Sequence, residues 1–237
     1  MTIDSLINLL IQYSEDLITW GITLLLLLGA ILLAWPRLCR SYRDRQLQKK
    51  IQAVAADALH QVVIPDGMDG AVYLENLLLT PDGLLLLPVH RYQGVVFAAD
   101  GIDNWTQVLG KRTYKFGNPL PQLESEILAV RYYASGIPVD GRVVFTKGVE
   151  FPKGRPGKLI SVAELEKMGE DNRLREVPSA YWQAWEALKQ KVQTPEVSKL
   201  RELYAIEKET TFNGRSIMAG VMFLVAGAWL GWRYLLV

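Results

Sequence analysis

The chain has 237 residues, half of them hydrophobic, and its 26 lysine and arginine residues nearly balance its 25 aspartate and glutamate residues, for a formal net charge of +1. This balance argues against a general nucleic-acid binder, because such proteins draw much of their affinity from a basic surface. The single cysteine, Cys39, excludes an intramolecular disulfide, and with only two histidines in the chain a zinc site built from cysteine and histidine is excluded as well.

The first apolar segment predicts a transmembrane helix over residues 17–36. Residues 17–35 read LITWGITLLLLLGAILLAW, without a charge, and at about 1.5 Å of rise per residue such a helix spans roughly the 30 Å of a bilayer core. The residues before it include acids and no lysine or arginine, unlike the basic start of a secretory signal peptide. Ile3, Leu6, Leu10 and Tyr13 recur at helical spacing, so residues 1–16 are expected to form an N-terminal amphipathic segment that lies on the membrane surface.

A second apolar segment at the C-terminus predicts another transmembrane helix, over residues 215–237, with Arg233 as the only charge after residue 215. Gly227 and Gly231 are four residues apart, a spacing that lets another helix approach closely. We expect this pair to be a contact point for a second copy of the chain or for a membrane complex.

The basic residues beside the two apolar segments predict the orientation, because such residues are retained on the cytoplasmic side. Those after the first segment and before the second are Arg37, Arg40, Arg43, Arg45, Lys49, Lys50, Lys208 and Arg215. We expect a multi-pass protein of a bacterial inner membrane with both termini outside and the central domain in the cytoplasm. The lipid bilayer is its first expected partner. The basic run could also attract anionic headgroups, although a role in topology alone explains it.

The central segment predicts an α/β domain over residues 37–176 and a helical connector over residues 177–214. Pro81-Asp82-Gly83 is a turn signal between two apolar runs, so these runs are expected to form a hairpin. The expected helices are 43–60 and about 118–133, and the expected strands are 61–64, 71–80, 84–90, 94–98 and 142–146.

Four pieces of this segment occur in a familiar order. Residues 74–97 read LENLLLTPDGLLLLPVHRYQGVVF, Trp105 follows, residues 116–133 read FGNPLPQLESEILAVRYY, and residues 137–145 read IPVDGRVVF. In this order they resemble the nuclease-related domain, NERD, a branch of the PD-(D/E)XK restriction-endonuclease-like superfamily. The resemblance covers about residues 60–165. It implies a small mixed sheet flanked by helices, here with one transmembrane helix at each end of the chain.

The resemblance also implies where a catalytic site would lie, and two of its three residues are replaced. The family's metal-binding aspartate falls on Glu75, its glutamate on Pro88 and its lysine on His90. Phosphodiester hydrolysis needs a divalent metal held by clustered carboxylate oxygens, and of these three residues only Glu75 offers one. Pro88 supplies no ligand, and His90 is cationic only part of the time. No cofactor is therefore expected, and Mg²⁺ or Mn²⁺ would be needed only if the domain is active.

Three functions stay open. The first is a membrane-anchored nuclease-related domain that has lost hydrolysis and binds nucleic acid or protein. The second is a metal-dependent nuclease with a shifted site, since replaced motif residues do not prove inactivity in a fold with many functions. The third is a structural subunit of a membrane complex. A further acid beside Glu75 would favour the nuclease, and a filled, apolar site would favour the binding module.

Overall fold

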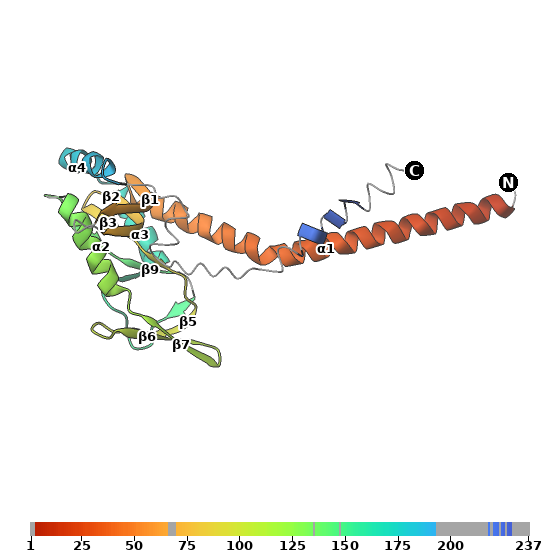
Figure 1. The fold of residues 1–237 in the computed structure, drawn as a ribbon, viewed down its shortest axis with the longest axis horizontal. Helices are drawn as coiled ribbons and strands as arrows, with labels where there is room; N and C mark the ends of the chain where they lie inside the picture. Colours follow the sequence, from red (N-terminus) through yellow and green to blue (C-terminus); the bar gives the residue numbers. More distant parts are fainter. Residues whose placement is uncertain are drawn as a thin grey trace. The chain divides into compact units, whose positions relative to one another are not determined.

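The computed structural model describes most of the chain up to residue 192 (Figure 1). The described residues are 3–65, 70–134, 136–146 and 148–192, together with isolated helical positions between 218 and 228. The second half of the expected connector and most of the expected C-terminal span, including Gly231, therefore lie outside the described residues.

The chain divides into two compact units, one formed by Met1–Arg45 with Glu207–Val237 and the other by Gln46–Ile206. Helix α1 (Ile3–Val54) begins in the first unit. It is a single uninterrupted helix and contains Pro36. Within the described residues, the stretch Trp20–Val54 of this helix is the one that is long and apolar enough to cross a membrane. Length and composition alone support this statement.

Small side chains line the inner side of α1 in this unit. Thr23 and Ala30 are buried, and a Cβ atom on Gly29 would lie 2.5 Å from Met222 Cε. The absence of a side chain at Gly29 therefore lets the helical positions near Met222 approach α1. Gly227, expected to be a contact point, is exposed, and a Cβ atom there would meet no atom within 4 Å.

The second unit is built around a mixed sheet with the strand order β1-β2-β3-β8. Its strands are β1 (Asp57–Pro65), β2 (Ala71–Thr80), β3 (Gly83–Leu86) and β8 (Val139–Gly141). The β2–β3 hairpin has the turn that the sequence predicts, and Thr80 Oγ1 donates a hydrogen bond to the Gly83 carbonyl at 2.8 Å. β3 pairs with β8 in parallel, whereas the other two pairings are antiparallel.

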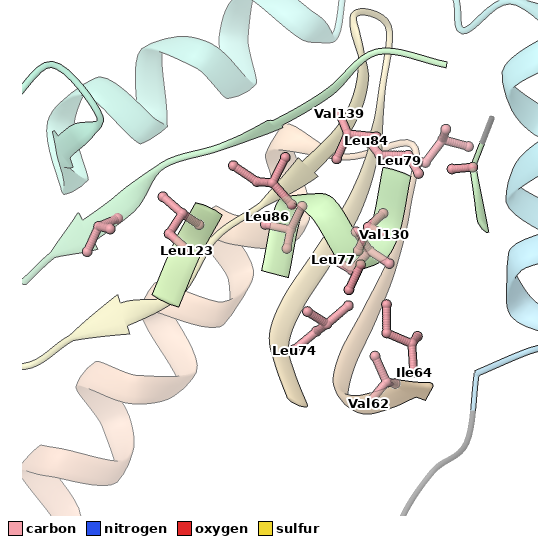
Figure 2. Packing of buried hydrophobic residues seen from close by; sticks show 14 of the residues in the cluster. Val62, Ile64, Leu74, Leu77, Leu79, Leu84, Leu86, Leu123, Val130 and Val139 are labelled. Carbon is pink, nitrogen blue, oxygen red and sulfur yellow. The ribbon is translucent and has the colours of Figure 1, made fainter. Parts of the chain in front are cut away.

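Both faces of this sheet are covered, which explains why β2 and β3 are almost continuously apolar. On one face, Leu77 and Leu86 pack with helix α2 (Leu120–Tyr133), through residues such as Leu123 (Figure 2). On the other face, alternate leucines of the same strands pack with the end of α1 and with helix α3 (Val162–Asn172). The residues of this second cluster include Leu47, Ile51, Val54, Leu78, Leu85 and Leu165.

Two smaller sheets complete the unit. The sheet β11-β9-β4 is parallel, and the sheet β10-β5-β6-β7 ends in an antiparallel hairpin. Their strands are β4 (Val89–His90), β5 (Gly94–Phe97), β6 (Asn104–Leu109), β7 (Arg112–Gly117), β9 (Val143–Phe145), β10 (Val149–Glu150) and β11 (Leu159–Ser161). The mixed α/β architecture agrees with the expected class, and the closer comparison with the restriction-endonuclease-like fold stays a prediction.

Helix α4 (Ser179–Lys189), at the start of the expected connector, packs on the core of the domain. Trp185 is fully buried, and its indole Nε1 donates to Asp57 Oδ2 at 2.7 Å. This aromatic residue therefore joins the last described helix to the first strand of the sheet.

Two expected elements were wrong in their extent. The helix predicted over 43–60 ends at Val54, and Leu59, assigned to its apolar face, lies on β1 opposite Leu77 of β2. Strand pairing with β2 thus overrides a helical spacing that stays regular only up to Val54. The strand predicted over 84–90 is divided between β3 and β4 by Leu87 and Pro88.

Replacing Gly83 with alanine tests the β2–β3 turn. Gly83 has a φ of +124°, and a Cβ atom there would lie 2.2 Å from the Pro138 carbonyl oxygen. Gly83→Ala should lower the free energy of unfolding by roughly 2–4 kcal/mol, from backbone strain and this clash together. Gly101→Ala is the matched control, because Gly101 has a φ of +76° but open space around it, so only about 1 kcal/mol should be lost. Equal losses in chemical denaturation of the detergent-solubilised protein would contradict the clash.

Candidate functional site

Glu75, Pro88 and His90, the residues to which the resemblance assigns a catalytic site, lie where two neighbouring strands separate. β3 leaves β2 after Leu86, and Leu87 makes the last backbone bond between them, donating its N–H to the Asn76 carbonyl at 3.0 Å. Along its other edge the same chain stays paired, with Leu84 opposite Val139 and His90 opposite Phe145. The separation therefore removes strand hydrogen-bond partners from the backbone of residues 87–89 only on the side facing β2.

Two polar side chains of β2 fill this separation. Asn76 Nδ2 donates to the Leu87 carbonyl at 2.8 Å, and Glu75 Oε2 accepts the Val89 N–H at 2.7 Å. Asn76 is buried, and its Oδ1 accepts a hydrogen bond of 2.8 Å from His60 Nδ1 on β1. Backbone groups that lose a ladder partner are costly when they are buried without a hydrogen bond. The side chains of Glu75 and Asn76 thus supply the hydrogen bonds that a paired strand would otherwise provide.

The alternation of side chains between the two faces of the sheet shifts at this same point of β2. Val72 and Leu74 pack in the α2 cluster, and so does Leu77, so the alternation of faces shifts by one residue at Glu75 and Asn76. On β1, Gln61 lies opposite this point and has a φ of +52°, the left-handed region in which a residue with a side chain is uncommon. The position of the Glu75 side chain is therefore set by a local distortion of both strands.

The second carboxylate oxygen of Glu75 faces a cation. Arg91 Nη1 lies 3.5 Å from Glu75 Oε1, and the Glu75 side chain keeps 23% of its surface exposed. One oxygen of this carboxylate is thus engaged by a backbone donor and the other by a guanidinium group.

Pro88 lies within the parallel pairing with β9. Its carbonyl accepts the Val144 N–H at 2.9 Å, but its nitrogen has no hydrogen to donate to the ladder. This missing donor coincides with the break between β3 and β4, which agrees with the expectation that a strand proline lies at an edge or an irregularity.

His90 points into a group of aromatic rings. Its ring stacks on Tyr92 at 5.8 Å and on Phe145 at 5.7 Å between centroids. Burial, together with the smaller effect of the nearby Arg91 charge, lowers the pKa of His90 from its ordinary 6.5 to about 4. The imidazole is therefore neutral at pH 7, at the position to which the resemblance assigns the family's lysine.

The tryptophan of the resemblance belongs to the same aromatic group. Trp105 is fully buried and stacks on Phe145, while Tyr92 stacks on Phe116 with centroids 4.1 Å apart. The indole Nε1 of Trp105 donates to the Ala99 carbonyl at 3.0 Å. The surroundings of His90 are thus filled by aromatic side chains.

Glu126 is the acid near Glu75 that our sequence reasoning missed. It lies on α2, is 5% exposed, and its Oε1 accepts a hydrogen bond from Gln122 Nε2 at 2.9 Å. Burial raises the pKa of Glu126 from 4.5 to about 7, and the charge of Glu75 raises it too, against the opposing effect of the Gln122 hydrogen bond. The signal was present in the sequence, because Glu126 shares the apolar helical face of Leu123 and Val130.

Asn118, another residue of the resemblance, has a structural contact pattern. Its side chain donates to the Ile102 carbonyl at 2.9 Å and accepts the Leu120 N–H at 2.9 Å. It therefore fixes the loop before β6 to the first turn of α2, the helix that carries Glu126.

A protein-family model matches the part of the chain that carries these residues. Residues 43–146 match the family model of the nuclease-related domain, NERD. A nuclease-related domain occupies this part of the chain. The match extends from α1 to the residue after β9 and contains Glu75, Pro88, His90 and Glu126. No curated protein and no solved structure matches the chain.

The chemistry of the donor set does not fit the divalent metal that nuclease chemistry implies. Mg²⁺ and Mn²⁺ prefer several carboxylate oxygens, whereas here one engaged carboxylate, Glu75, lies beside Arg91 and beside Glu126, whose pKa is close to neutrality. Across the described part of the chain, no group of three or more histidine, cysteine, aspartate or glutamate side chains is placed to hold a metal ion.

Replacing Glu126 with glutamine should change how stability depends on pH. Because the folded-state pKa of about 7 exceeds the ordinary 4.5, the native protein binds this proton more tightly than the unfolded chain does. Stability should therefore fall as pH rises from about 4.5 to 7, and Glu126→Gln should remove this fall. From pH 5 to pH 8 the variant should gain roughly 1–3 kcal/mol relative to the wild type.

Thermal unfolding across this pH range measures the effect. Glu124→Gln is the control, since Glu124 is exposed on the same helix and pairs with Lys158. That substitution should change stability by under about 1 kcal/mol. Parallel pH profiles for the wild type and Glu126→Gln would mean that the buried carboxyl does not carry this proton.

Proposed function

We propose that this chain is a membrane-anchored, nuclease-related protein whose domain has lost metal-dependent hydrolysis and acts by binding a nucleic acid or a protein. The observation that carries the proposal is the position of the Glu75 carboxylate between the Val89 N–H and Arg91. A carboxylate that completes the backbone hydrogen bonding of a strand loses a structural role if it turns toward a metal. The hydrogen bond from Val89 and the ion pair with Arg91 therefore oppose the use of Glu75 as a metal ligand.

His90 supports the same proposal, because hydrolysis also requires a fixed positive charge. Hydrolysis of a phosphodiester builds negative charge in the transition state, which a fixed cation beside the scissile phosphate stabilises. A neutral imidazole that stacks on Tyr92 and on Phe145 supplies no such charge at pH 7. Arg91 carries a charge next to this position, but it faces Glu75.

A metal-dependent nuclease with a shifted site is the second candidate, and Glu126 is the observation that favours it. Two carboxyl groups, those of Glu75 and Glu126, are near enough for the charge of one to affect the pKa of the other. A cation beside them would favour the ionised form of both. The third possibility, a structural subunit of a membrane complex, stays a prediction.

A hydrolysis assay separates the first two candidates. The full-length protein, purified in detergent, is incubated with single- and double-stranded DNA and RNA in the presence of Mg²⁺ or Mn²⁺. Glu75→Gln is the sharpest comparison, because glutamine keeps an oxygen that accepts the Val89 N–H while losing the negative charge. We expect no metal-dependent cleavage above that of Glu75→Gln or Glu126→Gln. Cleavage by the wild type that falls at least tenfold in both variants would establish the shifted site instead.

Membrane anchoring is the other part of the proposal. The apolar stretch of α1 and the arginines that follow it support a span with the domain on the cytoplasmic side. The apolar residues near the C-terminus support a second span and an inner-membrane location, with both termini outside.

A reporter that is active only in the cytoplasm tests this topology. Inserted between Lys153 and Gly154, two exposed residues between β10 and β11, it should be active. The same reporter fused after Val237 should be inactive. The reverse pattern would invert the orientation, and equal activity of both fusions in a soluble fraction would refute membrane anchoring.

A further inference from the structure

We propose that residues 35–45 of α1 form a binding surface for the headgroups of anionic phospholipids. The inference rests on the proposed membrane anchoring and adds a lipid preference to it. Four arginines and one acid, Asp44, lie within this segment, so it carries a formal charge of about +3.

The position of the segment along the helix is the first argument. α1 continues without interruption from the apolar stretch through residue 45, so each residue advances the chain by about 1.5 Å. Arg37, Arg40 and Arg43 then lie roughly 3, 7 and 12 Å beyond Trp35 along the axis. The headgroup layer of a bilayer is about 5–8 Å thick on each side of the hydrocarbon core. The long side chains of these arginines can therefore place their charges within or at the edge of that layer.

The two faces of the segment are the second argument. Trp35, Leu38 and Tyr42 lie three and four residues apart, which puts them on one face, and they are 59%, 61% and 63% exposed. The exposed side chains of Arg40 and Arg43 lie on other sides of the helix. An aromatic and aliphatic face combined with arginines is typical of helices at a membrane interface. A soluble polyanion such as nucleic acid would use the charges but would leave this apolar face in water.

The availability of the charges is the third argument. Arg37, Arg40 and Arg43 form no ion pair with another described residue. By contrast, Lys50, at the next part of the helix, pairs with Glu166 of α3 and so contributes to the domain. Within the described part of the chain, the arginines nearest the apolar stretch are thus available to an external anion.

Lipid retention measures the proposed binding. Full-length protein in a mild detergent is titrated with phosphatidylglycerol or phosphatidylcholine, and bound lipid is counted by native mass spectrometry. The wild type should retain phosphatidylglycerol in clear preference to phosphatidylcholine. Arg40→Gln/Arg43→Gln should weaken phosphatidylglycerol binding by roughly 10- to 30-fold, from about 1 kcal/mol for each basic residue. The other arginines stay in place to preserve the orientation of the helix.

The control removes two positive charges from elsewhere in the chain. Arg112→Gln/Lys115→Gln alters two exposed residues of β7, and it should leave phosphatidylglycerol retention within about twofold of the wild type. Equal losses in both double variants would show a general effect of charge and would overturn the assignment. An oligonucleotide bound through Arg40 and Arg43, with no preference among lipids, would overturn it in favour of a soluble polyanion.

Extraction of membranes at alkaline pH separates failure of this inference from failure of the proposed anchoring. Protein that stays with the membrane but shows no preference for anionic lipid refutes the headgroup surface alone. Protein that is released by the extraction refutes the anchoring as well.

Discussion

The hydrogen bond from the Val89 N–H to the Glu75 carboxylate makes the separation of two strands possible. β4 can leave β2 and continue beside β9 only if the backbone groups left behind find other partners. Glu75 supplies the acceptor, and Asn76 supplies the donor for the neighbouring carbonyl. The positions of the Glu75 and Asn76 side chains are thus tied to the break in strand pairing between β2 and the chain after β3.

A carboxylate at this position can either hold a metal or complete the hydrogen bonding of the backbone, and the surroundings of Glu75 favour the second role. A carboxylate that holds a metal needs oxygens that face solvent and substrate, with other acids nearby. Glu75 instead has a backbone donor on one oxygen and Arg91 at the other. His90, which burial keeps neutral at pH 7, packs against the rings of Tyr92 and Phe145.

The patterns that predicted the fold well were those with strong local causes. The Pro81-Asp82-Gly83 turn was predicted because proline and glycine restrict the backbone in known ways, and α2 because a proline opens it and apolar residues follow at helical spacing. The β6–β7 hairpin was missed since most of its side chains are exposed, which leaves no apolar alternation to detect. The structure brings Glu75 beside Val89 and Arg91, the two neighbours of His90 in the chain, and these partners come from tertiary contacts. Arg91 and Glu126 could not be placed near Glu75 until β4 and α2 were placed against β2.

Trp185 has a consequence for where this protein can be divided. The family match ends at residue 146, yet the core includes Leu159 of β11 and the indole of Trp185, which is bonded to Asp57 at the opposite end of the domain sequence. A polypeptide shortened to the matched segment would expose the apolar face that these later residues cover. The compact unit is thus longer than the matched segment, because β11 and α4 complete its core.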